Sequence, residues 1–147
     1  MIELVLVLLL VSILSLFILP RLFDLTVFDA HGYFDSLDAA LGFARREAIA
    51  SECPVSVSLS GTGYALDQAP ACTTGSFSQP VVNPASGQAY TGILPSGISQ
   101  STSPLTQEIL FNSSGMSAAQ ETVTITGGGF SGILTIESGT GLVTHSP

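Results

Sequence analysis

Residues 1–20 form an almost uninterrupted apolar run, and this run limits what the rest of the chain can fold into. Within residues 4–19 only Ser12 and Ser15 are neither aliphatic nor aromatic. A helix in a soluble core is seldom apolar on every face over four turns, and a membrane span needs about 20 apolar residues. The run therefore predicts a membrane-inserted helix with one acid, Glu3, at its head.

The residues around the run do not match a cleavable secretory signal. Such a signal has a basic stretch before a short apolar core and a small-residue cleavage site after it. Here nothing basic precedes the run, and Pro20 and Arg21 follow it in place of a small-residue site. This pattern favours a helix that is retained in the protein.

Glu3 requires a specific environment, because a carboxylate at the edge of an apolar helix costs a few kcal/mol unless it is neutralised or paired. Two environments satisfy this requirement. Glu3 lies among lipid headgroups near the start of the chain, or an amine of a partner in an assembly pairs with it.

Glu3, the apolar run and Pro20 together resemble the mature N-terminus of type IV pilins and of the pseudopilins of type II secretion. In that family a glutamate stands near the start of an apolar helix and a proline follows seventeen residues later, which is the separation of Glu3 and Pro20. The resemblance implies that Glu3 pairs with the terminal amine of a neighbouring subunit. It also implies that Pro20 allows the helix to melt locally as subunits stack.

The same family has a short basic leader, which a prepilin peptidase removes, and an N-methylated aromatic first residue. Only Met1 precedes Ile2-Glu3-Leu4 here, so the resemblance predicts that the sequence lacks its leader and the first two mature residues. The partners that it implies are other pilin or pseudopilin subunits, the inner membrane and the assembly platform.

The charge distribution excludes two kinds of partner. The formal net charge is −8, and the only Lys or Arg residues are Arg21, Arg45 and Arg46. Residues 47–147 therefore have no strongly basic side chain that could neutralise phosphates, which is the main source of non-specific nucleic-acid affinity. We expect no nucleic acid as a partner and no polybasic attachment to anionic lipid.

Cys53 and Cys72 are the only cysteines. In an exported head an even pair predicts a disulfide, which would close a loop of about twenty residues and stabilise the head by about 3 kcal/mol. Two free buried thiols are the alternative. A zinc site is disfavoured because two cysteines without nearby histidines make an incomplete ligand set.

An amphipathic helix is predicted after Pro20. Apolar residues recur at spacings of three and four, which places them on one helix face: Phe34, Leu37, Leu41, Ala44 and Ala48. Pro54 ends the pattern, because the residue before a proline is pushed out of the helical region. We expect one long helix from about Ile2 to about Ser51, kinked near Pro20. Residues 1–20 would form its membrane or filament-core part, and residues 21–53 its amphipathic continuation.

Residues 54–147 predict a β-rich head, which together with the helix makes an α+β fold. Strands are predicted where apolar and polar residues alternate, at 55–60, 64–66, 105–111, 121–126, 130–136 and 142–144. In the third of these we expect Leu105, Ile109 and Phe111 to point inward. Residues 67–103 are predicted as mostly loop, with a weak strand near 89–94. The strands should form one antiparallel meander that covers the apolar stripe of the helix.

The C-terminal half also resembles a narrower group. The pattern Leu110-Phe111-Asn112-x-x-Gly115, a Thr/Val/Ile-rich strand and Thr140-Gly141-x-Val143 is similar to minor pilins grouped with secretion pseudopilin H and FimT. That group includes minor pilins of the mannose-sensitive haemagglutinin type. The segment Ala44-Arg45-Arg46-x-Ala48 before a Val-x-Val strand extends the resemblance over most of the chain.

No catalytic, cofactor-binding or metal-binding constellation is predicted. Nucleophilic catalysis needs a base beside the nucleophile, and the only histidines are His31, on the membrane-proximal helix, and His145, third from the end. The acids after Arg46 are scattered singly, so paired-carboxylate chemistry has no support. We expect neither an enzyme nor a cofactor.

The function that these observations predict is structural. The chain should be a minor pilin or pseudopilin, a single-pass protein of the bacterial inner membrane with a periplasmic head, assembled through its N-terminal helix into a type IV pilus or a secretion pseudopilus. The alternative is a filament-borne binding module. It would be adhesin-like through the Ser/Thr-rich residues 67–103, or DNA-receptor-like, which the absence of basic residues disfavours.

Overall fold

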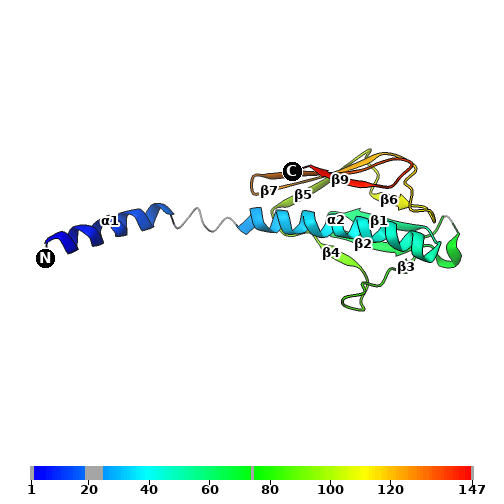
Figure 1. Cartoon of the computed structure of the whole chain (residues 1–147), viewed down its shortest axis with the longest axis horizontal. Helices are drawn as coiled ribbons and strands as arrows, with labels where there is room; N and C mark the ends of the chain where they lie inside the picture. Colours follow the sequence, from blue (N-terminus) through cyan, green and yellow to red (C-terminus); the bar gives the residue numbers. More distant parts are fainter. Residues whose placement is uncertain (1, 19–24, 74, 147) are drawn as a thin grey trace.

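In a computed structural model, the described part of the chain forms two α-helices followed by two antiparallel β-sheets (Figure 1). The structure describes residues 2–18, 25–73 and 75–146. Helix α1 spans Ile2–Ile18, and helix α2 spans Leu25–Ser51. Pro20 and the join between the helices lie outside the described residues, so the kinked continuous helix stays a prediction.

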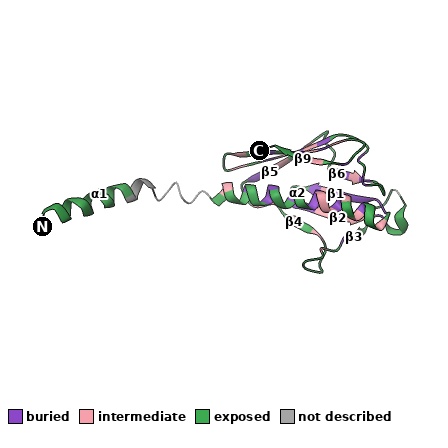
Figure 2. Ribbon diagram, in the orientation of Figure 1, coloured by how far each residue is buried: buried purple, intermediate pink, exposed green. Residues whose placement is uncertain are grey.

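Helix α2 buries one face against the head along its length (Figure 2). The five residues of the predicted stripe are all buried, and Ala30, Tyr33 and Ala40 extend the same face. The helix ends just before Glu52, whose backbone adopts the left-handed conformation with φ of 56°. A left-handed residue directly after the last turn is a common helix terminator. The amphipathic helix and its predicted end are confirmed over these residues.

The first sheet has the order β3–β2–β1–β6, and β4 also pairs with β2. Its strands are β1 (Val55–Ser60), β2 (Gly63–Gln68), β3 (Gln79–Pro80), β4 (Thr91–Ile93) and β6 (Glu108–Phe111). Strands β1 and β2 form the predicted hairpin, and the alternate apolar residues of β1 are buried. A short 3₁₀ turn, η2 (Pro70–Cys72), follows β2.

The second sheet has the order β5–β7–β8–β9. Its strands are β5 (Ile98–Ser103), β7 (Glu121–Gly127), β8 (Phe130–Ile136) and β9 (Val143–Ser146). The β7–β8 hairpin closes on the pair Gly127 and Phe130, so its turn has two residues. These are Gly128 and Gly129, with φ of 59° and 89°. A two-residue hairpin turn of type I′ has positive φ at both positions, which glycine adopts without strain.

The hydrophobic core lies between α2 and the inner faces of the two sheets, because α2 contacts strands of both. Each sheet contributes fully buried apolar side chains from alternate positions: Val57, Ile109 and Phe111 from the first, and Val123, Ile125, Leu134 and Ile136 from the second. Burial of this apolar surface is the main force that holds the helix to the sheets.

Three predictions about the head were wrong. The strands form two sheets rather than one, because alternation shows which residues share a face but not which strand is the neighbour; β7, β8 and β9 do form the antiparallel meander predicted for the end of the chain. Leu105 is not inward: it precedes β6 and is 92% exposed, whereas Ile109 and Phe111 are buried as predicted. Residues 67–103 are less irregular than predicted, because β5 occupies six of them.

Candidate assembly site

Helix α1 is exposed from Ile2 to Leu14 (Figure 2), and its sequence is apolar on all sides except at Glu3 and its serines. Its large apolar side chains from Ile2 to Leu14 have exposed fractions between 46% and 85%, so they bury little surface within the subunit. An apolar surface of this extent is stable only against lipid or against other apolar surfaces. Among the described residues, no single helix combines the length and the hydropathy that crossing a membrane requires.

Ser12 does not interrupt this surface. Its hydroxyl donates to the backbone carbonyl of Leu8 and also to that of Leu9, at 3.3 Å. A serine that bonds back to the preceding turn satisfies its own polar group within the helix. Ser12 is therefore compatible with an apolar neighbour.

Glu3 lies in the first turn of α1, and its side chain is exposed. A carboxylate at this end of a helix is favoured by the helix dipole. No hydrogen bond or ion pair joins Glu3 to another described residue, so its carboxylate is open to a partner from outside the described chain. Pro20, the second residue predicted to act in assembly, lies outside the described residues.

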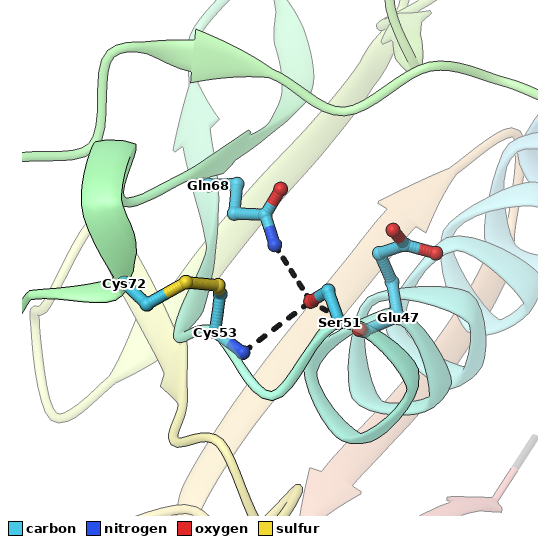
Figure 3. Close-up of a disulfide and its surroundings, with 5 residues drawn as sticks. All are labelled: Glu47, Ser51, Cys53, Gln68 and Cys72. Atoms are coloured by element: carbon cyan, nitrogen blue, oxygen red, sulfur yellow. Dashed lines mark hydrogen bonds between the residues drawn. A yellow bond between two sulfur atoms is a disulfide. The ribbon is translucent and has the colours of Figure 1, made fainter.

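Cys53 and Cys72 form a disulfide, with their Cα atoms 4.4 Å apart. The bond fastens the C-terminal end of α2 to η2 (Figure 3). The Ser51 hydroxyl donates to the Glu47 carbonyl at 2.7 Å and accepts from the Gln68 side-chain amide at 2.6 Å. This end of α2 is therefore fixed to strand β2 by hydrogen bonds as well as by the disulfide.

Arg45 fastens two C-terminal turns to α2. Its Nε donates to the carbonyl of Gly115 at 3.3 Å and to that of Thr140 at 3.2 Å. A Cβ at Gly115 would lie 2.6 Å from the Ile49 side chain, and one at Gly141 would lie 2.1 Å from the Gly115 carbonyl oxygen. The glycines of the predicted C-terminal pattern are therefore required by close packing around the arginine.

Gln100 connects α2 and β5 to the β1–β2 hairpin, and the sequence did not predict this role. The Tyr33 hydroxyl donates to Gln100 Oε1 at 2.7 Å. The Gln100 side-chain amide donates to the carbonyls of Ser60 and, at 3.1 Å, Gly63. Burial, with a smaller effect of Tyr64, raises the pKa of Tyr33, so its hydroxyl stays protonated as a donor. The helix and both sheets thus meet at one amide.

Glu121 was also missed as a buried residue. It is 7% exposed, and its Oε2 has no hydrogen-bond partner within the described structure. Burial raises the pKa of the Glu121 carboxyl, and a hydrogen bond with the Thr106 side chain partly opposes this. The sequence indicates this burial only by spacing, because Glu121 lies two residues before Val123 and four before Ile125, on the inward face of the same strand.

The two histidines lie apart from any catalytic arrangement. The ring of His31 lies 4.1 Å from that of Phe130, and His145 Nδ1 lies 3.7 Å from an Asp38 oxygen. Among the described residues no three His, Cys, Asp or Glu side chains are close enough together to hold a metal ion.

A long helix packed along two antiparallel sheets, preceded by an exposed apolar helix, defines a pilin-like subunit. Two solved structures have the same fold. The type IV minor pilin FimU of Pseudomonas aeruginosa is 19% identical over 80% of this chain and 87% of its own, with a TM-score of 0.62. The minor pseudopilin EpsH from the type 2 secretion system of Vibrio cholerae is 17% identical over 80% and 96%, with a TM-score of 0.63. No curated protein sequence matches the chain.

Residues 34–140 match the family model described as type II transport protein GspH. The chain therefore belongs to the GspH family and is a minor pilin or pseudopilin of a type IV pilus or type II secretion system. Subunits of this family are structural and not enzymatic, which agrees with the prediction from the scattered acids and histidines.

Proposed function

We propose that this chain is held in the bacterial inner membrane by its N-terminal helix, with its head in the periplasm, and is then moved into a filament of other pilin or pseudopilin subunits. The observation that carries the proposal is the exposure of α1, whose apolar side chains from Ile2 to Leu14 remain largely exposed in the subunit. Lipid tails and the apolar helices of other subunits are equivalent surroundings for such a surface. One helix can therefore serve first as an anchor and then as filament core.

Glu3 is the residue to which we assign the register of assembly. Within a bundle of apolar helices an unpaired carboxylate is costly, so a neighbouring subunit must supply a positive group. The terminal amine of that subunit is the group with the right charge. We assign to Pro20 the role of weakening the backbone hydrogen bonds of the helix as subunits stack. The prepilin peptidase and the assembly platform are the further partners that this route requires.

Within the family we place the chain with the FimT-like minor pilins, including those of the mannose-sensitive haemagglutinin type. The contacts of Arg45 with Gly115 and Thr140 support this assignment, because they connect the two sequence patterns on which the resemblance rests. A role as a DNA receptor is not proposed, because residues 47–147 contain no Lys or Arg.

Replacement of Glu3 by Ala tests the assembly role. The variant should insert into the inner membrane, because the change removes only a charge from the apolar helix. Its amount in sheared filaments should fall by at least about tenfold, which corresponds to a loss of about 1.4 kcal/mol per subunit contact. Ser12→Ala is the matched control, since it removes a polar group from the same helix and should assemble normally. Normal incorporation of Glu3→Ala would refute the pairing.

A further inference from the structure

Strand β5 has an open edge. It is the first strand in the order β5–β7–β8–β9, so β7 is its only strand partner among the described residues. The β7–β8 turn shows which backbone groups face this edge. The closing pair of a two-residue hairpin, here Gly127 and Phe130, exchanges both of its hydrogen bonds. Along β7 the residues that bond to β8 then alternate with those that bond to β5.

This alternation assigns the serines of β5 to the bonds with β7. The backbone groups of Ile98, Gln100 and Thr102 therefore point away from β7. The Ile98 N–H donates to the Pro95 carbonyl at 3.4 Å. Within the described structure, the N–H and C=O groups of Gln100 and Thr102 have no backbone partner. They form a short row of donors and acceptors that an extended chain could complete.

An open groove with a volume of 640 Å³ follows this edge. Five consecutive residues of β5, 98–102, line it. Because successive side chains of a strand point to opposite faces, all five can line one groove only if it runs along the edge of the strand. The other wall includes Leu59 and Gln107. Leu105 also lines the groove, and its side chain is 92% exposed, which the packing of the head does not explain.

The open edge lacks the features that normally prevent strands from pairing. Edge strands usually carry charges, a proline or a bulge, whereas β5 has the sequence ISQSTS. The other edge strands of the described sheets are short. Strands β3, β4 and β6 have two to four residues each. Strand β9 also has four residues, and it contacts α2.

We propose that β5 receives an extended, uncharged segment of another filament subunit as an additional strand. This inference rests on the proposed function. The groove is lined by uncharged residues in a chain of net charge −8, so it fits a neutral segment and offers no counter-charge to an acidic or basic one. Addition of a strand to a sheet edge is a general mode of peptide recognition, in which the backbone supplies affinity.

The added strand is not the β5 strand of a second copy of the chain. Antiparallel pairing of two β5 strands is two-fold symmetric, and it would reverse the direction of one α2 helix relative to the other. Subunits that share one membrane and one filament keep their N-terminal helices in the same direction. The added strand must therefore come from a surface other than β5.

Amide hydrogen exchange on the full chain tests the proposal directly. It compares the chain in detergent with the chain in purified filaments. The amides of Gln100 and Thr102 should exchange fast in detergent and at least about tenfold more slowly in filaments. Those of Ser101 and Ser103, which bond to β7, should be slow in both states and serve as the internal control. Fast exchange of Gln100 and Thr102 within filaments would overturn the proposal.

A pair of variants at one position provides a second test. Thr102→Pro removes the N–H that faces the groove and keeps the bonds to β7, as proline is tolerated at a sheet edge. Thr102→Val keeps the N–H. The melting temperatures of the two variants should be equal, and only the amount of the proline variant in filaments should be reduced. Equal incorporation of the two variants would overturn the proposal. If the unchanged chain is absent from filaments, the proposed function itself fails, and strand addition between filament subunits fails with it.

Discussion

Replacement of Gln100 by Leu tests whether one amide fastens α2 to both sheets. The change keeps a side chain of similar size but removes the acceptor for the Tyr33 hydroxyl and the donor to the carbonyls of Ser60 and Gly63. A net hydrogen bond contributes about 0.5–1.5 kcal/mol, and a buried group left unpaired costs about 1–3 kcal/mol. Because Gln100 is only half-buried and water can replace part of its bonds, we expect a loss of about 1–3 kcal/mol.

The companion variant Tyr33→Phe removes only the hydroxyl bond and should cost about 1 kcal/mol. In the double variant the Tyr33–Gln100 bond is lost only once. The double variant should therefore lose about 0.5–1.5 kcal/mol less than the sum of the two single variants. For a head of about 100 residues, each 1 kcal/mol corresponds to a melting-temperature shift of about 4–8 °C.

The assay is urea unfolding of the full chain in detergent. The chain contains three tyrosines and no tryptophan, so tyrosine fluorescence follows the combined environment of the three, two of which remain in Tyr33→Phe, and circular dichroism follows the secondary structure. Ser99→Leu is the matched control, because it adds the same side chain to an exposed position of the same strand and should stay within about 0.5 kcal/mol of the original chain. Additive losses in the double variant would refute a shared bond.

Three further predictions concern the core, the disulfide and the buried acid. Leu41→Ala should cost about 2–5 kcal/mol because Leu41 is fully buried, and thermal unfolding should show it against Leu105→Ala, which should change little. Replacing both Cys53 and Cys72 by Ala should cost about 3 kcal/mol, and a reducing agent should then have no further effect on unfolding. Since burial raises the pKa of Glu121, the native state binds its proton more tightly than the unfolded state. The contribution of Glu121 to stability should fall as pH rises from its ordinary pKa through the raised one, so Glu121→Gln should be more stable than the original chain at pH 7.

Each of these three has a clear contrary outcome. Equal costs at Leu41 and Leu105 would contradict the position of α2 in the core. A further loss of stability on reduction of the double variant would show that the reductant acts elsewhere. If Glu121→Gln left the pH profile of stability unchanged, the slope would belong to other groups. Burial also raises the pKa of Asp67, so the pH profile of Asp67→Asn would be measured next.

The sequence predicted those helices and strands whose apolar residues recur with a single clear period, either the helical spacing of three and four or the alternation of a strand. The helical stripe of Phe34, Leu37 and Leu41 is buried because no other helix face is apolar enough to cover a sheet. The β7–β8 hairpin was predictable for a similar reason, since strict alternation before three glycines and a β-branched run after them leave few other solutions. The disulfide followed from the presence of only two cysteines.

Strand β5 could not be predicted in this way, because Ile98 is its only large apolar residue and its pairing with β7 makes it a strand. The roles of Gln100 and Glu121 were missed for a related reason. The sequence alone does not show whether a polar side chain faces water or lies at the junction of two sheets. Arg45 stood within a recognised pattern, but its contacts to Gly115 and Thr140 depend on how two distant turns fold back onto α2.

The central claim, that the N-terminal helix carries this subunit into a filament, is tested most directly by mass spectrometry of the N-terminus of the chain from membranes and from sheared surface filaments. The account predicts an N-methylated aromatic residue shortly before Ile2-Glu3-Leu4, and it predicts that this processed form is present in the filaments. An unprocessed Met1 found only in membranes would contradict the account.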